Sequence, residues 1–481
     1  MSIGKINVTR TLVQVEELLR KDRSISPAVR GMIELLMTIV TLMMDRLNLD
    51  SSTSSIPPSQ DPKRTRGAKA GSGKKRNKRK PGGQNGHKGT TLEPVDDPDE
   101  VECIPIDKRT LPRSTYTDAG YEARQVIEIL VQRHVVEYRA QILQDAEGQS
   151  FVAQFPPGVL RPIQYGGSVK VQSVYTSQQQ LIPYDRVRDY FHDQCGIPIS
   201  AGTIFNFNQE AFTRLEPFEA FLKTRLQQQP VLHADETGIQ IGKTLHWLHD
   251  LSNDRWTLLV PHPKRGAAAM NAIGVLPDFH GRLCHDHLQA YFQFPGLHCL
   301  CNAHHLRELE RAWIHDNQRW AFDMHALLLE INVRTLEAGA CLGETAAHAF
   351  RRRYRKILRR GELECPRAPN NGKRGRTAQS KSRNLLERLR DFETETLRFM
   401  TDPLVPFTNN QGENDLRMTK VQQKISGCFR SFEGAQIFCR VRSYLSTCRK
   451  QGHYCLQARQ QAVHGNPFIP ALVPEWLRKN A

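Results

Sequence analysis

Three short stretches, far apart in the chain, carry carboxylates of the kind that bind metal ions. They read His-Ala-Asp-Glu-Thr-Gly (233–238), His-Asp-His-Leu-Gln-Ala-Tyr (285–291) and Thr-Asn-Asn-Gln-Gly-Glu-Asn-Asp-Leu-Arg (408–417). Each places an acid on or at the end of an expected strand, or at the start of an expected helix. Carboxylate oxygens are the hard ligands that Mg²⁺ uses in phosphoryl chemistry, so three converging acids predict a site for two divalent cations.

The segment around the first two acids has the strand and helix order of an RNase H-like α/β core. The first and fourth expected strands are neighbours in such a core, so Asp235 and Asp286 would lie side by side. Two carboxylates that close repel each other, so either the pair binds metal or one member is protonated. Glu413 is expected to open a helix that packs back on the sheet. The expected strands are 230–241, 245–250, 256–260, 281–286 and 297–300, with short helical segments at 267–276 and 288–292 and a longer helix from about residue 304.

Length and charge set limits on the rest of the chain. The 481 residues are too many for one ordinary core, and the net charge of +17 predicts a polyanionic partner, with nucleic acid as the default. A charged surface that serves solubility alone is the alternative. The sequence carries no secretory signal, and its most apolar stretch (32–44) is too short to span a bilayer, so a cytoplasmic protein without membrane contact is expected. The 11 cysteines form no Cys-x-x-Cys pair, which argues against a zinc site.

Residues 51–100 form a separate, strongly basic region. Between Lys63 and Lys88 there are eleven lysines and arginines and no acid, so this segment cannot bury a core and is expected to be disordered. Such an arm binds DNA phosphates without reading sequence, whereas a solvated linker is the alternative. The candidate DNA-binding residues are Lys74, Lys75, Arg76, Lys78, Arg79, Lys80 and Lys88.

The remaining residues divide into further units. Residues 1–50 predict a helix, which forms either a coiled coil or a packed helix. Residues 101–160 predict a small β-containing unit with a strand at 125–130. Residues 161–225 predict two helices (184–195 and 202–212) around a turn, with Ser200 as N-cap; they form either a helix-turn-helix on DNA or a supporting hairpin. The catalytic domain would span 226–455 with a helical insertion at about 318–405, and 456–481 would be a C-terminal tail.

Several motifs, taken together and in order, connect this chain to a known family. The motifs are Lys80–Gly89, Leu181–Arg186, His233–Thr237, Cys301–Leu309, Thr408–Arg417 and Ser443–Lys450. Through them the chain resembles DDE transposases of the insertion sequence 66 family, from about residue 25 to 455. One departure is clear: family members often carry a cysteine pair after the basic arm, whereas this region holds only Cys103. Residues 101–160 therefore look like a degenerate zinc-binding region.

The resemblance implies an enzyme that binds the ends of its insertion sequence and then cleaves and transfers DNA strands. Asp235, Asp286 and Glu413 would hold two Mg²⁺ or Mn²⁺ ions, and no covalent protein–DNA intermediate would form. Glu236 and Asp415 compete with Asp235 and Glu413 as ligands, and the family match favours the latter two. Expected partners are double-stranded DNA (element ends and target), further copies of the chain in a homodimer or larger assembly, and possible accessory proteins of the element. The expected location is the cytoplasm of a bacterium, in association with the nucleoid.

Four further residues are candidates for auxiliary roles at this site. They are His304, His305, Arg307 and Arg417, which could line the site, orient Glu413 or hold a phosphate. Cys301 with the two histidines is also a possible soft metal site, although no second ligand pair follows at zinc spacing. Two other functions stay open at this point: a catalytically silent protein that binds DNA ends, and an RNase H-fold nuclease that cleaves without joining.

Overall fold

The computed structural model describes residues 92–369 and 377–453, together with scattered positions between residues 2 and 40. The expected basic arm with its seven candidate DNA-binding residues, most of the N-terminal helix and the C-terminal tail lie outside the described residues. In the described N-terminal positions, β1 (Ser2–Ile3) pairs with β2 (Ile6–Asn7).

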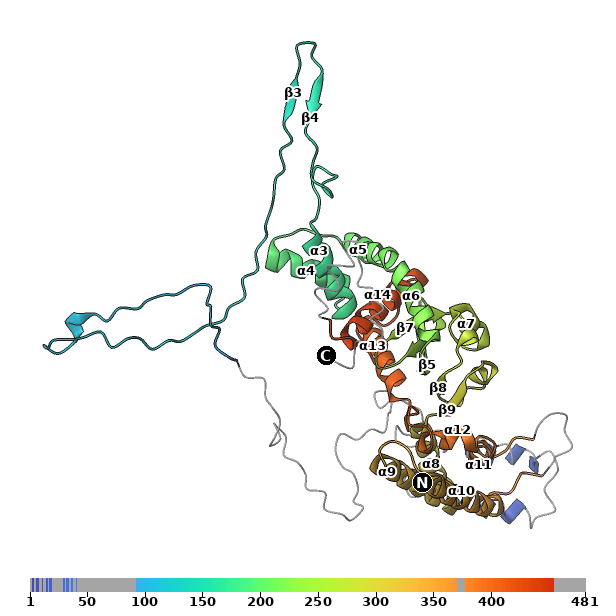
Figure 1. Cartoon of the computed structure of the whole chain (residues 1–481). Coiled ribbons are helices and arrows are strands. Elements are labelled where there is room, and N and C mark those ends of the chain that lie inside the picture. Colours follow the sequence, from blue (N-terminus) through green and yellow to red (C-terminus); the bar gives the residue numbers. More distant parts are fainter. Residues whose placement is uncertain are drawn as a thin grey trace.

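A five-stranded mixed sheet forms the centre of the fold (Figure 1). Its strand order is β7-β6-β5-β8-β9, with β5–β6–β7 antiparallel and β8 and β9 parallel to β5. The order of strands and helices predicted from the sequence is confirmed, and the architecture is mixed α/β as expected. The elements are β5 (Val231–Ile241), β6 (Thr244–Ser252), β7 (Thr257–His262), α7 (Ala267–Ile273), η3 (Leu276–Asp278), β8 (Arg282–His285), η4 (Gln289–Gln293) and β9 (Leu297–Leu300).

A two-residue turn sets the register of the central hairpin. Gly242 has a φ of 60°, a conformation that glycine adopts at little cost, and the turn pairs Ile241 with Thr244. The same register places Asp235 of β5 directly opposite Asp250 of β6. Because side chains directly opposite each other in an antiparallel pair share a face, this turn fixes which carboxylates meet.

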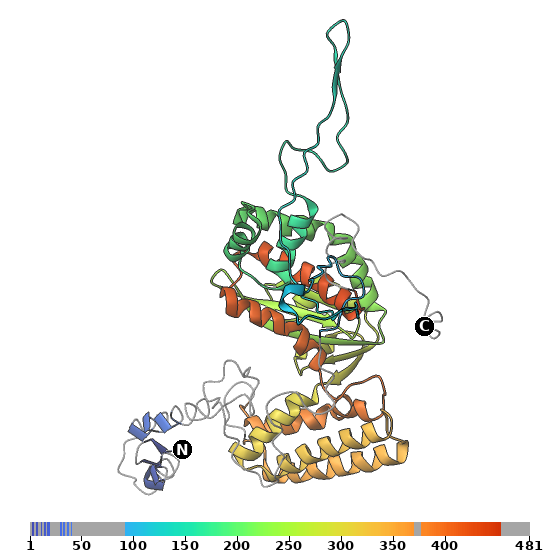
Figure 2. The ribbon, with the colours of Figure 1, turned by 90° about the vertical axis from the view of Figure 1, so that its left-hand side faces the viewer.

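Helices that precede and follow the sheet in the chain pack around it (Figure 2). Phe218 of α6 and Tyr444 of α14 share one core with Ala234 of β5, whereas Leu416 of α13 packs with Ile239 of β5 and Leu248 of β6 in a second core. Because successive residues of a strand point to opposite faces, these two cores lie on opposite faces of β5. The predicted pair of helices is confirmed, and Ser200 accepts a hydrogen bond from the Thr203 backbone N–H at 3.0 Å. The second helix packs against α14, as a supporting hairpin would. The elements are α3 (Gly167–Val174), η2 (Tyr175–Gln179), α4 (Tyr184–Cys195), α5 (Ala201–Arg214), α6 (Glu216–Gln227), α13 (Asn410–Ser426) and α14 (Phe432–Lys450).

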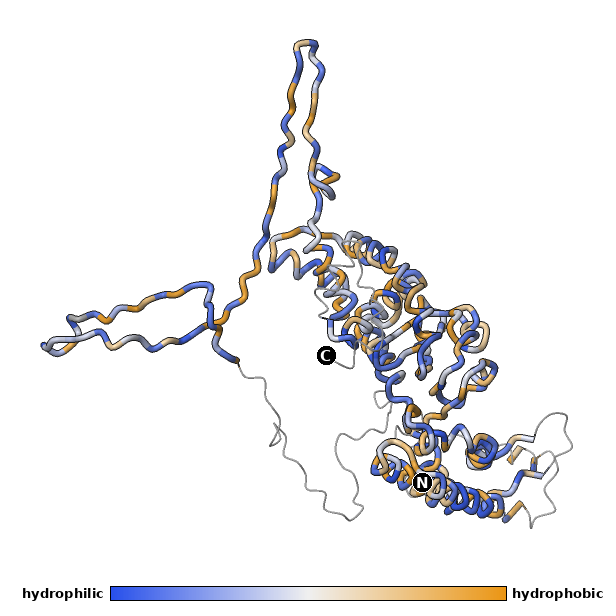
Figure 3. The backbone as a smooth tube through the Cα atoms, in the orientation of Figure 1, coloured by the Kyte–Doolittle hydropathy of each residue, from blue (hydrophilic) through white to orange (hydrophobic). Residues whose placement is uncertain are grey.

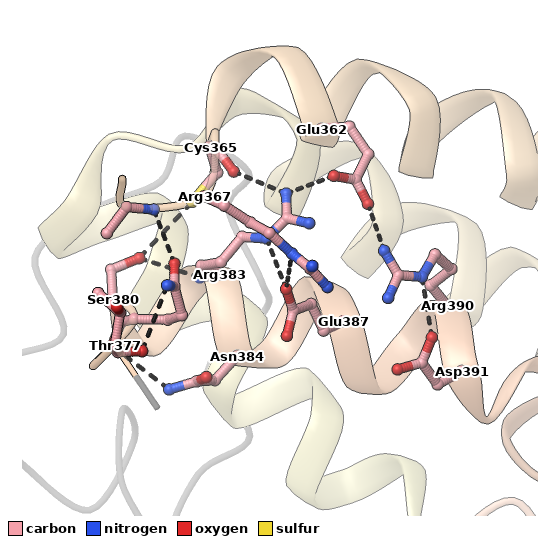
Figure 4. A network of polar contacts seen from close by, with 12 residues as sticks. Glu362, Cys365, Arg367, Thr377, Ser380, Arg383, Asn384, Glu387, Arg390 and Asp391 are labelled. Carbon is pink, nitrogen blue, oxygen red and sulfur yellow. Dashed lines mark hydrogen bonds and ion pairs between the residues drawn. The ribbon is translucent and has the colours of Figure 1, made fainter. Parts of the chain in front are cut away.

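A separate layer of helices lies between β9 and α13 in the chain and has its own core. Trp320, Met324 and Tyr354 are fully buried there. Arginine–carboxylate pairs tie the helices together: Arg383, 3% exposed, contacts both Glu362 and Glu387 (Figure 4). The elements are α8 (Asn302–Asp316), α9 (Arg319–Glu337), α10 (Glu344–Glu364), α11 (Lys381–Asp391), α12 (Glu393–Leu397) and η5 (Arg398–Met400).

The prediction of a strand at 125–130 is wrong. Between residues 92 and 165 the regular elements are η1 (Lys108–Thr110) and a short hairpin of β3 (Ile142–Gln144) and β4 (Ser150–Val152). The alternating apolar residues Ile127 and Ile129 are exposed, and the segment that carries them is extended (Figure 3). A strand needs a neighbour for its N–H and C=O groups, and alternation by itself does not supply one.

Candidate active site

Two of the three predicted acids come from adjacent parallel strands. The register pairs His233 of β5 with Cys284 of β8. Asp235 and Asp286 each follow two residues later, so continuation of this register brings the two carboxylates together at the end of β8. The Asp286 carboxylate is held by the Leu288 backbone N–H, which donates to Oδ1 at 2.8 Å.

The third acid reaches the same place from α13. Glu413 lies in the first turn of this helix, and the helix packs on β5 and β6. A Cβ atom at Gly412 would lie 3.3 Å from the Asp235 Cβ and 3.4 Å from Asp250 Oδ2, so the start of α13 rests directly on the two opposed acids. Only a residue without a side chain fits there unshifted, which explains the glycine next to Glu413.

Asn409, just before α13, fastens the helix to β5. Its Nδ2 donates to the Ala234 carbonyl at 2.9 Å, and its Oδ1 lies 2.7 Å from His233 Nδ1. An asparagine just before a helix can serve as its N-cap, and an exposed one can contact DNA. The structure shows neither a side-chain cap hydrogen bond nor an exposed amide, because Asn409 is 1% exposed. It is a structural clamp between helix and strand.

The acids of this site are incompletely neutralised. Burial, together with the carboxylates of Glu236, Asp286 and Glu413, raises the pKa of Asp235 to about 8. Among the described residues, the cations in contact with Asp235, Glu236, Asp286 and Glu413 are Arg265, 3.9 Å from Asp286 Oδ2, and Arg307, 3.7 Å from Glu413 Oε1. Glu413 Oε1 is buried and has no hydrogen-bond partner among the described residues. Four carboxyl groups with two guanidiniums leave oxygen ligands that further positive charge can neutralise, which fits divalent cations.

The two competing acids already have protein partners. Glu236 is buried and accepts hydrogen bonds from Tyr291 Oη at 2.6 Å and from Arg265 at 2.7 and 2.9 Å. Asp415 Oδ2 accepts from Lys450 Nζ at 2.7 Å and from Gln411 at 2.9 Å. These contacts occupy both carboxylate oxygens of Glu236 and the Oδ2 atom of Asp415. Asp235 accepts a hydrogen bond from the Glu236 backbone N–H, at 2.9 Å.

The four auxiliary candidates separate into two pairs. His304 Nδ1 lies 4.0 Å from Glu413 Oε1, and Arg307 approaches the same oxygen from one turn further along α8. His305 is buried and bonds Asn302 Oδ1 at 3.1 Å, away from Glu413. Arg417 is exposed on α13, and the described contacts of Glu413 are made by Arg307 and His304 instead.

Cys301, His304 and Glu413 also form a group whose ligand atoms lie within 4.8 Å of one another. The soft site considered from the sequence paired Cys301 with both histidines, whereas the structure substitutes Glu413 for His305. Burial raises the pKa of the Cys301 thiol, and its Sγ accepts a hydrogen bond from the Asn409 backbone N–H at 3.1 Å. Cys301 is buried, so in this structure its sulfur packs beside Asn409 and accepts that backbone hydrogen bond.

Several residues of the site are not apparent from the sequence motifs. Arg265 follows β7, stacks 4.8 Å over the Trp247 ring and reaches both Glu236 and Asp286; no spacing in the sequence points to it. Asp250 lies opposite Asp235, and its Oδ2 accepts a hydrogen bond from Ser252 Oγ at 2.7 Å. The two-residue turn at Gly242 pairs Ile241 with Thr244, and counting back along both strands from this pair places Asp250 opposite Asp235.

Comparison with protein families agrees with these motifs. The model of the Transposase IS66 family matches residues 163–437, more than half of the chain. The chain belongs to this transposase family. The match runs from the helices before the sheet into α14 and includes all three acids, and membership implies an enzyme that cuts and transfers DNA. Residues 8–93 match a family of unknown function (DUF6444). No curated protein matches the chain. Within the described residues, none of the helices is long and apolar enough for a membrane span.

Proposed function

We propose that this transposase binds the ends of an insertion sequence and catalyses DNA cleavage and strand transfer at a site formed by Asp235, Asp286 and Glu413. The observation that supports it most is the convergence of three acids from β5, the end of β8 and the first turn of α13. Burial and the neighbouring carboxylates raise the pKa of Asp235. Structural ion pairs are normally balanced, whereas an uncompensated acidic cluster is typical of a metal-dependent site.

We further propose that residues 226–455 form an RNase H-like core with a helical insertion at about 318–405. The supporting features are the sheet order β7-β6-β5-β8-β9 and the position of α9 to α12 between α8 and α13. In this arrangement Glu413 follows the insertion and returns to the sheet. The insertion therefore separates the third acid from the others in sequence but not in space.

The three acids would hold divalent cations, Mg²⁺ or Mn²⁺, with two ions expected; bound there, such ions supply Lewis-acid activation of water and of a 3′-hydroxyl and stabilise the leaving oxygen. The residues of the chain orient this ligand set. The Leu288 N–H holds Asp286, Asn409 fastens the helix that carries Glu413, and Arg265 with Tyr291 holds Glu236 out of the ligand set.

Arg307 and His304 are placed to bind the DNA backbone next to Glu413. A guanidinium pairs well with a phosphate, and Arg307 makes a loose contact of 3.7 Å with Glu413, which leaves donors for a second partner. Burial and the nearby Arg307 lower the pKa of His304, so its neutral imidazole can donate or accept a hydrogen bond at a phosphate.

Double-stranded DNA, as element ends and as target, is the proposed partner. Two ends must be joined, so a homodimer or larger assembly is proposed, with accessory proteins of the element as further candidates. The basic residues of the 51–100 arm would add contacts to phosphates that do not depend on sequence. The proposed location is the bacterial cytoplasm, at the nucleoid.

The test is a cleavage and strand-transfer assay on labelled DNA that carries the element ends, with Mg²⁺ or Mn²⁺. Asp235→Asn, Asp286→Asn and Glu413→Gln should each lower the rate at least about 100-fold, since ligand loss removes several kcal/mol of transition-state stabilisation. Asp254→Asn, in the exposed turn between β6 and β7, is the matched control and should keep full activity.

The outcomes separate the functions that the sequence left open. Loss of both steps in the three variants, with DNA binding retained, supports the proposal. DNA binding without cleavage by the wild type would indicate a silent end-binding protein. Cleavage without joining would indicate a nuclease, and activity that survives Glu413→Gln would show that Glu413 is not the third ligand.

A further inference from the structure

Helix α10 carries an unusually dense run of basic residues. Seven of the ten residues from Arg351 to Arg360 are lysine or arginine. The helix buries one face, with Tyr354, Ile357 and Leu358, against the core of the helical layer. At about 100° per residue, the direction opposite that face is occupied by three cations, all exposed: Arg352, Lys356 and Arg359.

The arginines beside this ridge are neutralised by neighbouring elements. Arg353 pairs with Glu330 of α9 at 2.6 Å, and Arg360 pairs with Asp323 of the same helix at 2.5 Å. On the other side, Glu393 of α12 accepts from Arg355 at 2.9 Å. These pairs tie α10 to its neighbours, so the flanking arginines have a structural explanation.

The three ridge cations have no such explanation. Within residues 92–369 and 377–453, Arg352, Lys356 and Arg359 form no ion pair or side-chain hydrogen bond. Helix α10, which carries them, lies at the side of the layer away from the sheet (Figures 1 and 2). An ordinary solvated helix face intersperses both signs of charge, whereas this ridge presents one sign only.

The spacing of the ridge fits a nucleic-acid backbone. Arg352 to Arg359 spans seven residues, which is about 10 Å of helix at 1.5 Å per residue. A single strand of B-DNA carries one phosphate for about every 3.4 Å of axis, so three cations over this length can each meet a phosphate. The contact would be to the backbone and independent of base sequence, since the ridge lacks amide side chains for base reading.

We propose that the ridge formed by Arg352, Lys356 and Arg359 is a DNA-binding surface, separate from both the active site and the 51–100 arm, that contacts the phosphates of duplex DNA. The proposal rests on the proposed function in so far as it takes DNA to be the substrate. It assigns the helical layer a role: it extends the contact with DNA beyond the three acids, as an enzyme that holds two ends requires.

The experiment measures binding of the full chain to a fluorescent 40-base-pair duplex of random sequence, in EDTA, from 50 to 200 mM salt. Lys356→Gln/Arg359→Gln removes two ridge cations. Each lost phosphate contact flattens the slope of log K against log salt by about 0.9, so the slope should become less steep by about 1.8. The affinity lost through the substitution should therefore be about tenfold greater at 50 mM than at 200 mM salt.

The matched control is Arg319→Gln/Arg334→Gln on α9. It removes the same charge from exposed side chains of the same layer, but these two arginines pair with Asp323 and Glu337. A slope that changes only in the ridge variant, with unchanged thermal unfolding, supports the proposal. Equal slopes in wild type and ridge variant, or equal changes in both variants, overturn it. Because EDTA prevents cleavage, this binding result does not depend on whether the chain is a transposase. If the wild type cleaves DNA in the metal-containing assay but the ridge variant binds DNA like the wild type, the ridge proposal is refuted and the proposed function stands.

Discussion

Asp235→Asn should make the metal-free protein more stable while it abolishes activity. Burial and three neighbouring carboxylates raise the pKa of Asp235 to about 8, whereas the unfolded chain titrates this group near 4. Folding therefore favours the protonated acid. Stability from this group is complete below about pH 4 and is lost progressively as the pH rises to about 8, because over that range the folded state binds a proton that the unfolded state has released.

The magnitude follows from the size of the shift. One pKa unit corresponds to about 1.4 kcal/mol, so the wild type should lose up to about 1.4 kcal/mol per pH unit through this window, and about 6 kcal/mol in total as an upper bound. Relaxation of the acids and counter-ion binding will reduce this. An asparagine side chain is nearly isosteric and does not ionise, so the variant lacks this contribution.

The assay is denaturant unfolding of both proteins in EDTA between pH 5 and 8. The difference in unfolding free energy between Asp235→Asn and wild type should grow with pH, and Asp254→Asn should show no such growth. Added Mg²⁺ or Mn²⁺ should stabilise the wild type more than Asp235→Asn, since binding to the folded state alone raises its stability. A difference that is constant over the pH range, or a variant that is less stable at pH 8, would refute the charge argument.

Three further predictions concern the packing that positions the site. Gly412→Ala should destabilise the fold by about 1–3 kcal/mol and lower the cleavage rate at least about tenfold, because the added Cβ would lie 3.3 Å from the Asp235 Cβ. The control for thermal unfolding and activity is Gly202→Ala in the first turn of α5, where the added Cβ would lie 3.7 Å from Ser200 Oγ. Equal behaviour of the two variants would contradict the packing argument. Lys450→Met should cost about 3 kcal/mol, since it leaves the largely buried Asp415 carboxylate with Gln411 as a donor but without its cation. Lys450→Met/Asp415→Asn should recover part of that loss in a double-mutant cycle, and strict additivity would show that the pair is not coupled. Ser200→Ala should cost about 1 kcal/mol in urea unfolding through loss of the α5 cap, and no change would mean that the cap is redundant.

Much of the fold could be predicted from local patterns. Five strands and the intervening helices follow from apolar periodicity, and Ser200 and Ser431 cap the helices that they precede. The prediction of a strand at 125–130 was wrong because that segment has no neighbouring strand. A strand is stable only when a neighbour satisfies its backbone N–H and C=O groups, and which segments become neighbours depends on the whole fold.

The candidate site was predictable in part. The acids Asp235, Asp286 and Glu413 could be named because each sits in a motif whose element was recognisable, and their catalytic role stays a prediction. Arg417 was a candidate to orient Glu413 because it lies four positions further along the same helix, but its side chain is exposed on the folded helix. Arg307, on a different helix, is the arginine that reaches Glu413; the motif predicted that it lines the site or contacts a phosphate.

The sequence by itself determined the identity of the acids, the order of the elements and, through the turn at Gly242, the opposition of Asp235 and Asp250. These depend on neighbours along the chain or on one turn. Only the tertiary structure decided which acids keep free oxygens: Lys450 binds Asp415, Arg265 and Tyr291 bind Glu236, and Asp235 lies among other carboxylates that raise its pKa. A carboxylate becomes a metal ligand or a structural ion-pair partner according to the charges and burial around it, and those are set by packing between segments that are distant in sequence.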